Sequence, residues 1–142
     1  MRIALIAAGI LIFLAASAGV ARWLTADNAE RDKVTDLLRA QARGDAAAML
    51  RELDRCAGGC AVRVRANAER LRRPGKLEIA RYDSDTSHAL GADTGQTRVV
   101  WKTPATLTVV QCVTVERKGN PISGIDVRLL GISGPIPRES SC

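Results

Sequence analysis

Residues 106–132 read TLTVVQCVTVERKGNPISGIDVRLLGI, and this stretch decides the fold class. Apolar and polar residues alternate along it, as in β-strands with one buried face. The pattern predicts strands over 106–117 and 122–132, joined by a hairpin turn at residues 118–121. The residues expected on the buried face are Leu107, Val109, Gln111, Val113, Val115, Ile125, Val127 and Leu129.

The same period of two marks two shorter strands upstream. They are predicted over 76–82 and 96–102, with a polar loop over 83–95 between them. Together with the closing pair they make four strands, enough for an antiparallel sheet with one face on a core.

Before the strands, apolar residues recur at steps of three and four, which is the spacing of an amphipathic helix. This spacing predicts helices over 29–43, 46–54 and 61–72, with breaks at Gly44 and after Arg73. Helices collected before strands indicate an α+β fold with the helices packed on one sheet face.

The helical stretch ERDKVTDLLRAQARGDAAAMLREL, residues 30–53, and the strand pair 106–132 together resemble the nuclear transport factor 2-like (cystatin-like cone) superfamily, in its bacterial membrane-anchored extracytoplasmic form. The resemblance implies a curved four-stranded sheet wrapped around a long helix to form a cone with a pocket. Some members are isomerases, dehydratases or cyclases, and others only bind ligands or proteins. The Asp–His pair of the enzymes has no counterpart here in matching context, so the resemblance favours binding.

The first part of the chain is apolar. Residues 3–21 carry no charge, and as a helix they would span about 28 Å, close to the hydrocarbon thickness of a bilayer. Arg22 and Trp23 at their end suit a membrane interface. The segment is either an uncleaved signal anchor or a signal peptide cleaved after Ala18. The first reading gives a single-pass plasma-membrane protein and the second a secreted one, both with the C-terminal part outside the cytoplasm.

These observations divide the chain into four parts. The predicted parts are a signal anchor or signal peptide (1–24), a linker (25–28), a nuclear transport factor 2-like domain (29–133) and a C-terminal tail (134–142).

All four cysteines follow the apolar segment, and an even number of them indicates disulfides formed in an oxidising compartment. Three pairings are possible. We favour Cys56–Cys60, because the intervening glycines allow the chain to fold back, and Cys112–Cys142, which ties down the tail. No metal site is expected, because the spacing lacks the C-x-x-C pairs of zinc sites.

The amino-acid composition limits the classes of partner that the protein is expected to bind. Aromatic residues make up 3% of the 142 residues and there is one His, which argues against base stacking and against multi-histidine metal sites. We expect no cofactor. We expect no nucleic-acid partner. The net charge is +6, and an anionic lipid or cell-wall polymer is a possible partner for one arginine-rich helix. Its basic residues are Arg63, Arg65, Arg70, Arg72 and Arg73.

Few residues are candidates for catalysis or for ligand binding. His88 with Asp83 or Asp85 could act as an acid–base pair, but the interpretation we favour is a solvated loop, because loops are ordinarily polar. A ligand pocket, if present, would be lined by Gln111, Trp101 and Tyr82.

The leading interpretation is a non-catalytic domain of the bacterial cell envelope that binds a protein or a small apolar ligand. The alternatives are a small pocket enzyme of isomerase, cyclase or hydrolase type using the 83–88 loop, and a structural accessory subunit of an envelope complex.

Overall fold

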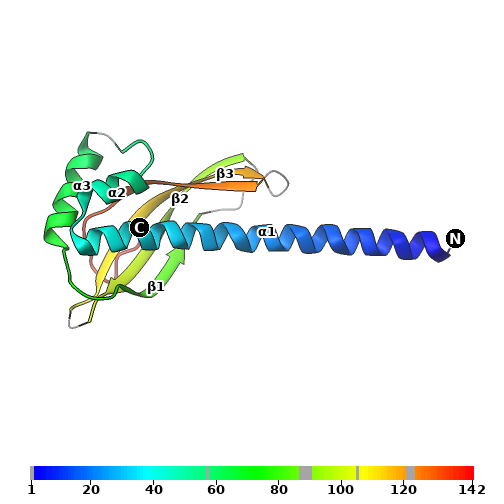
Figure 1. Ribbon diagram of the computed structural model, residues 1–142, viewed down its shortest axis with the longest axis horizontal. Helices are drawn as coiled ribbons and strands as arrows, with labels where there is room; N and C mark the ends of the chain where they lie inside the picture. Colours follow the sequence, from blue (N-terminus) through cyan, green and yellow to red (C-terminus); the bar gives the residue numbers. More distant parts are fainter. Residues whose placement is uncertain (1, 57, 87–90, 105, 121–123) are drawn as a thin grey trace.

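The computed structural model describes residues 2–56, 58–86, 91–104, 106–120 and 124–142. Within them the helices precede the strands, which confirms the α+β class (Figure 1). The elements are α1 (Arg2–Arg43), α2 (Ala46–Glu52), α3 (Gly59–Arg70), β1 (Glu78–Ser84), β2 (Gly91–Lys102), β3 (Val109–Asn120) and β4 (Gly124–Ile132).

Helix α1 runs without interruption through the predicted linker at 25–28, so that prediction is wrong. The linker was inferred from polarity, but two of its polar side chains have partners on the helix or on the sheet. Thr25 Oγ1 donates to the Ala21 carbonyl at 2.8 Å, and Asp27 pairs with Arg117 of β3. Ala26 is buried, so the helix already contacts the domain at this point.

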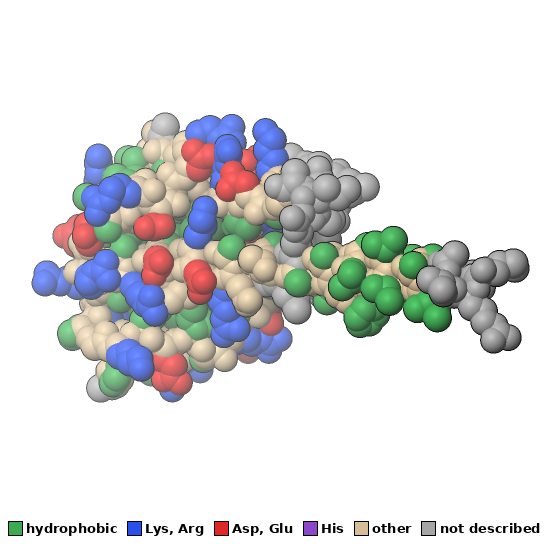
Figure 2. All heavy atoms as spheres, turned by 45° about the vertical axis from the view of Figure 1, so that its right-hand side comes forward, with side chains coloured by type: hydrophobic (Ala, Val, Ile, Leu, Met, Phe, Trp, Pro, Cys, Tyr) green, Lys and Arg blue, Asp and Glu red, His purple; other side chains and the backbone are tan. Residues whose placement is uncertain are grey.

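The apolar half of α1 extends out of the domain (Figure 2), with side chains such as Phe13 70% exposed. By length and composition this helix is able to cross a membrane. A hydrophobic surface of this kind requires cover by lipid or by another apolar surface.

The strands form one antiparallel sheet in the order β1-β2-β3-β4, which curves beside the second half of α1, while α2 and α3 gather at the far end of that helix (Figure 1). The predicted loop over 83–95 is too long, because Ser84 still pairs in β1 and Gly91 already pairs with Gly119 of β3. Backbone pairing extends these strands through polar positions that an alternation pattern does not register.

The core lies between α1 and the sheet. Leu37, Leu38, Trp101, Val113 and Val115 are among its fully buried residues. The predicted buried face of the long hairpin is confirmed for Val109, Gln111, Val113, Val115, Val127 and Leu129. Leu107 is the exception at 78% exposed, because it precedes β3 and has no strand partner to set its face.

Both predicted disulfides are present, Cys56–Cys60 and Cys112–Cys142. The second holds the C-terminal tail along β3. Two backbone hydrogen bonds extend this pairing, from Ser133 N–H to the Cys112 carbonyl at 2.8 Å and from Ile136 N–H to the Val110 carbonyl at 2.9 Å.

Candidate functional site

The site lies between α1 and the sheet, on the side of the core nearer the apolar segment of α1 (Figure 1), and is built on an ion pair. Arg117 Nη2 lies 2.6 Å from Glu30 Oε2, and Arg117 Nε donates to the same oxygen at 2.8 Å. The side chains of Glu30 and Arg117 are 0% and 5% exposed. Asp27, one helical turn before Glu30, is 2.7 Å from Arg117 Nη2.

Four hydroxyl groups complete the coordination of the Glu30 carboxylate. Tyr82, Ser84 and Thr97 donate to Oε1 at 2.7, 2.9 and 2.6 Å, and Thr86 donates to Oε2 at 3.0 Å. A carboxylate offers about four lone-pair sites, so these bonds and those from Arg117 leave it no acceptor capacity. We call this set the Glu30 cluster: Asp27, Glu30, Tyr82, Ser84, Thr86, Thr97 and Arg117.

A close approach of two segments makes the cluster possible. A Cβ atom on Gly95 of β2 would lie 2.7 Å from Thr86 Cα and 2.8 Å from the Asp85 carbonyl oxygen. Glycine at this position therefore lets β2 contact the segment after β1, which holds the Thr86 hydroxyl against Glu30.

The charges inside the cluster are fixed by their surroundings. Burial alone would raise the pKa of Glu30, but hydrogen bonds from Thr97, Tyr82 and Arg117, together with the charge of Arg117, hold it below its ordinary value. Burial, reinforced by the charge of Glu30, raises the pKa of Tyr82. The carboxylate thus stays ionised and the phenol stays neutral near pH 7.

A polar cavity of about 350 Å³ opens beside the cluster. It is lined by Asp27, Asn28, Arg31, Tyr82, Ser84, Thr86 and Arg117. The Arg31 guanidinium carbon is 5.6 Å from the centre of the Tyr82 ring, within the range of a cation–π contact.

A second polar group spans helix and sheet further along α1. Gln111 Oε1 accepts from Gln41 Nε2 and Trp101 Nε1, both at 2.8 Å. Gln111 Nε2 donates to Gln41 Oε1 at 3.2 Å and to the Ser133 carbonyl at 2.9 Å. Every donor and acceptor of this amide is used by the protein, so Gln111 joins α1 to the sheet and has none left for a ligand.

The predicted site residues are only partly brought together. Of the three expected to line a pocket, Trp101 and Gln111 are fully buried in the core, and Tyr82 alone borders a cavity described above. Asp83 pairs on the surface with Arg81 at 2.7 Å and Arg98 at 3.6 Å. Asp85 is exposed, and His88 lies outside the described residues.

The five arginines predicted to contact an anionic partner do not all lie in one place. Arg63, Arg65, Arg70 and Arg72 are exposed and Arg73 is half-buried. Only Arg72 and Arg73 line a cleft together with cations from α1.

Sequence reasoning missed Glu30, Arg117 and Gln41. The sequence contains a pattern that points to these residues. Glu30, Val34, Leu37 and Gln41 follow the helical spacing of one buried face, and Arg117 continues the alternation that begins at Val109. Polar residues at positions expected to be buried, on two elements that face each other, predict such a pair.

No family model matches the chain, and neither a curated protein nor a solved structure is significantly similar to it. Among the described residues, no group of three or more His, Cys, Asp or Glu side chains is arranged to hold a metal ion. Function is therefore inferred from the geometry of the chain itself.

Proposed function

We propose that this protein is a single-pass, membrane-anchored extracytoplasmic domain that works by binding and not by catalysis. The observation that carries the proposal is α1, which passes unbroken from an exposed apolar segment into the core of a domain with two disulfides. The apolar segment supplies the anchor, and the disulfides fit an oxidising compartment outside the cytoplasm.

A cone of the nuclear transport factor 2-like type is the fold we propose for the domain. The order of helices before strands, the antiparallel meander β1-β2-β3-β4 and the long helix along its inner face support this assignment. Folds of this kind host both enzymes and binding proteins, so the choice between them rests on the site.

The chemistry of the Glu30 cluster argues against catalysis. A general base needs a free lone pair and a pKa near the working pH. Glu30 has neither, because its oxygens are occupied and its pKa is lowered. Tyr82 is an equally poor proton donor, because its pKa is raised. The cluster is suited to fixing α1 on the sheet.

An accessory subunit would present an extended apolar surface to its complex. Among the described residues after the apolar half of α1, the exposed large hydrophobic side chains are Val62 of α3 and Leu107 before β3. Two single side chains on separate elements do not favour that alternative.

Fractionation of a bacterial host that expresses the full chain tests the anchor. We expect the protein to stay in the membrane after alkaline carbonate extraction and its intact mass to include residues 1–24. Protease added to spheroplasts should digest the domain, and a variant with Leu11→Lys and Leu14→Lys should be lost from the membrane. Wild-type protein in the soluble fraction, or a domain protected from protease, would contradict the proposal.

A further inference from the structure

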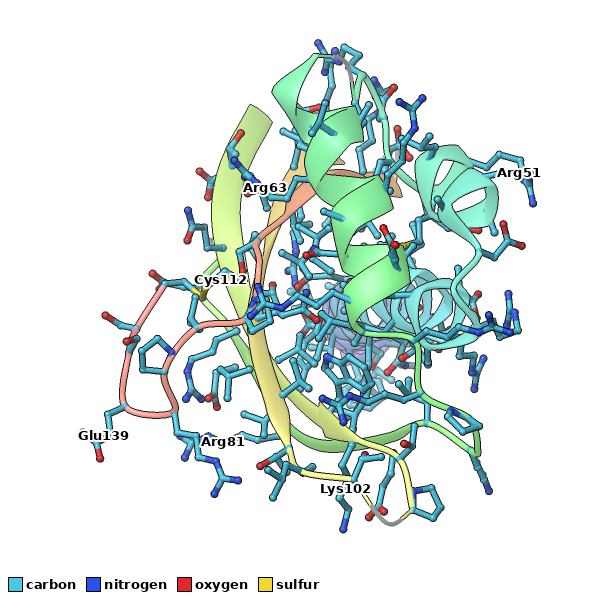
Figure 3. The ribbon with its side chains drawn as sticks, turned by 90° about the vertical axis from the view of Figure 1, so that its left-hand side faces the viewer. Arg51, Arg63, Arg81, Lys102, Cys112 and Glu139 are labelled. Carbon is cyan, nitrogen blue, oxygen red and sulfur yellow. A yellow bond between two sulfur atoms is a disulfide. The ribbon has the colours of Figure 1, made fainter. Side chains whose placement is uncertain are left out.

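A basic cleft of about 640 Å³ lies at the end of the domain opposite the apolar segment. Figure 3 views this end of the domain almost along α1, with α3 in front. The charged side chains that line the cleft are Arg39, Arg43, Arg72, Arg73 and Lys76, and no Asp or Glu is among the described residues of its lining.

The chain builds the cleft by joining the ends of two helices. Gly44, with φ of +77°, ends α1 and turns the chain, a conformation that glycine adopts without strain. Its missing side chain leaves room for Arg72, whose Cδ lies 3.0 Å from the position a Gly44 Cβ would take. The Arg73 N–H then donates to the Ala42 carbonyl at 2.9 Å, which holds the segment after α3 against the end of α1.

The positive charge of the cleft is largely unneutralised. Of its five cations, only Arg39 has a carboxylate partner in the described chain, the exposed Asp36 at 2.9 Å. The Nε–H of Arg73 is buried and has no acceptor within that same part of the chain. A buried donor without an acceptor is unfavourable, and an anion in the cleft would relieve it.

Helix dipoles explain part of this pattern, because cations near a helix C-terminus are favourable. They do not explain Lys76, which lies six residues beyond the end of α3, or the convergence of both helix ends on one cleft. Converging guanidinium groups match the oxygens of phosphate, to which each can donate two parallel hydrogen bonds.

We propose that this cleft binds a multiply charged phosphoryl group. The position of the cleft along α1 indicates which kind of molecule carries that phosphoryl group. This step rests on the membrane anchoring proposed above. Residues 22–43 form helix between the apolar segment and the cleft, which amounts to about 30 Å. An upright α1 of this length holds the cleft beyond the headgroups of its own membrane, so the phosphoryl group belongs to a ligand free in the envelope.

Calorimetric titration of the full-length protein with inorganic tripolyphosphate, in nanodiscs of neutral lipid, tests the site. We expect saturable binding of one ligand per protein. The double variant Arg43→Gln, Lys76→Gln should weaken it at least tenfold. The matched control Arg63→Gln, Arg65→Gln removes the same charge from exposed positions of α3 outside the cleft and should change the affinity less than twofold.

Two results would overturn the site: no saturable binding at millimolar tripolyphosphate, or equal weakening by the control pair, which would indicate diffuse attraction. Neither depends on the anchor, so they are distinct from a failure of the proposed function.

The source is tested by repeating the titration in nanodiscs rich in phosphatidylglycerol. We expect an unchanged affinity, because salt screens surface charge within about 10 Å at 0.1 M ionic strength. Tenfold weaker binding there would show that headgroups occupy the cleft and would overturn the assignment to a free ligand.

Discussion

Glu30 of α1 and Arg117 of β3 form an ion pair inside the core, with 2.6 Å between Oε2 and Nη2. Gln41 and Gln111 join the same two elements by a second buried hydrogen bond of 2.8 Å. The pairs are about 16 Å apart along the helix and about 20 Å apart along the strand. A slide of α1 by one turn would break both, so the two pairs set the register of the helix on the sheet.

The ion pair should be essential for stability. We expect Glu30→Gln to lower the free energy of unfolding by about 3 kcal/mol or more, because it leaves a buried guanidinium without its main counter-charge. The double variant Glu30→Met, Arg117→Met should cost less than the sum of the single changes. Urea unfolding followed by circular dichroism measures both.

The matched control for that experiment is Asp36→Asn, which breaks the ion pair with Arg39 on the same helix. Both of these side chains are more than half exposed, so the change should stay within about 0.5 kcal/mol. An effect of Glu30→Gln as small as that of the control would contradict a structural role for the cluster.

Tyr82 should resist ionisation. The folded protein raises its pKa above the ordinary 10.0, so its contribution to stability is complete below pH 10 and is lost as the pH rises further. Tyr82 is the sole tyrosine of the chain, so the near-ultraviolet absorbance of phenolate reports on it alone. We expect that signal to appear only with alkaline unfolding, and near pH 10 in denaturant. Phenolate formation at pH 10 with native circular dichroism would refute the buried hydrogen bond to Glu30.

Glu30 should make the protein sensitive to acid. Its pKa in the folded protein is lowered from 4.5, so its contribution is complete above that pH and is lost as the pH falls through the folded-state pKa. The urea midpoint of the wild type should therefore decrease more steeply below pH 4.5 than that of Glu30→Gln. Parallel curves for the two proteins would argue against a lowered pKa.

Gln111 should not be replaceable by an apolar residue of similar size. Gln111→Leu leaves the Trp101 indole N–H and the Gln41 amide without partners, and we expect a loss of about 3 kcal/mol. The Ser133 carbonyl loses one of its two donors and keeps Asn67 Nδ2 at 2.8 Å. Gln96→Leu at an exposed position of β2 is the control and should change stability by about 0.5 kcal/mol or less. Equal effects in thermal unfolding would mean that the buried amide contributes little.

The two disulfides should contribute unequally to the free energy of unfolding. Cys112–Cys142 spans 30 residues and Cys56–Cys60 spans 4, and loop-closure entropy assigns them about 3.5 and about 2 kcal/mol. Serine replacement of Cys112 and Cys142 should lower the denaturation midpoint more than serine replacement of Cys56 and Cys60. It should also expose the tail after Ile132 to proteolysis. A larger loss from the short loop would show that strain or local packing outweighs chain entropy.

Local pattern was sufficient for much of the fold. The change from helical to strand periodicity predicts helices followed by an antiparallel sheet, and Val34, Leu37 and Leu38 lie on the buried face as their spacing requires. The sequence also favoured both observed disulfides among the three possible pairings, because a five-residue segment with two glycines closes easily and Cys142 could fix a tail that otherwise frays.

Tertiary structure decided the site. The burial of Glu30 depends on Arg117, which is 87 residues away, and a polar residue in an amphipathic helix remains solvated unless such a partner faces it. A contact across the fold also accounts for the predicted linker being helix, since Asp27 within it pairs with Arg117 of β3. The basic cleft needed the ends of α1 and α3 side by side. Periodicity reports which face of an element is buried, but only packing shows what that face meets.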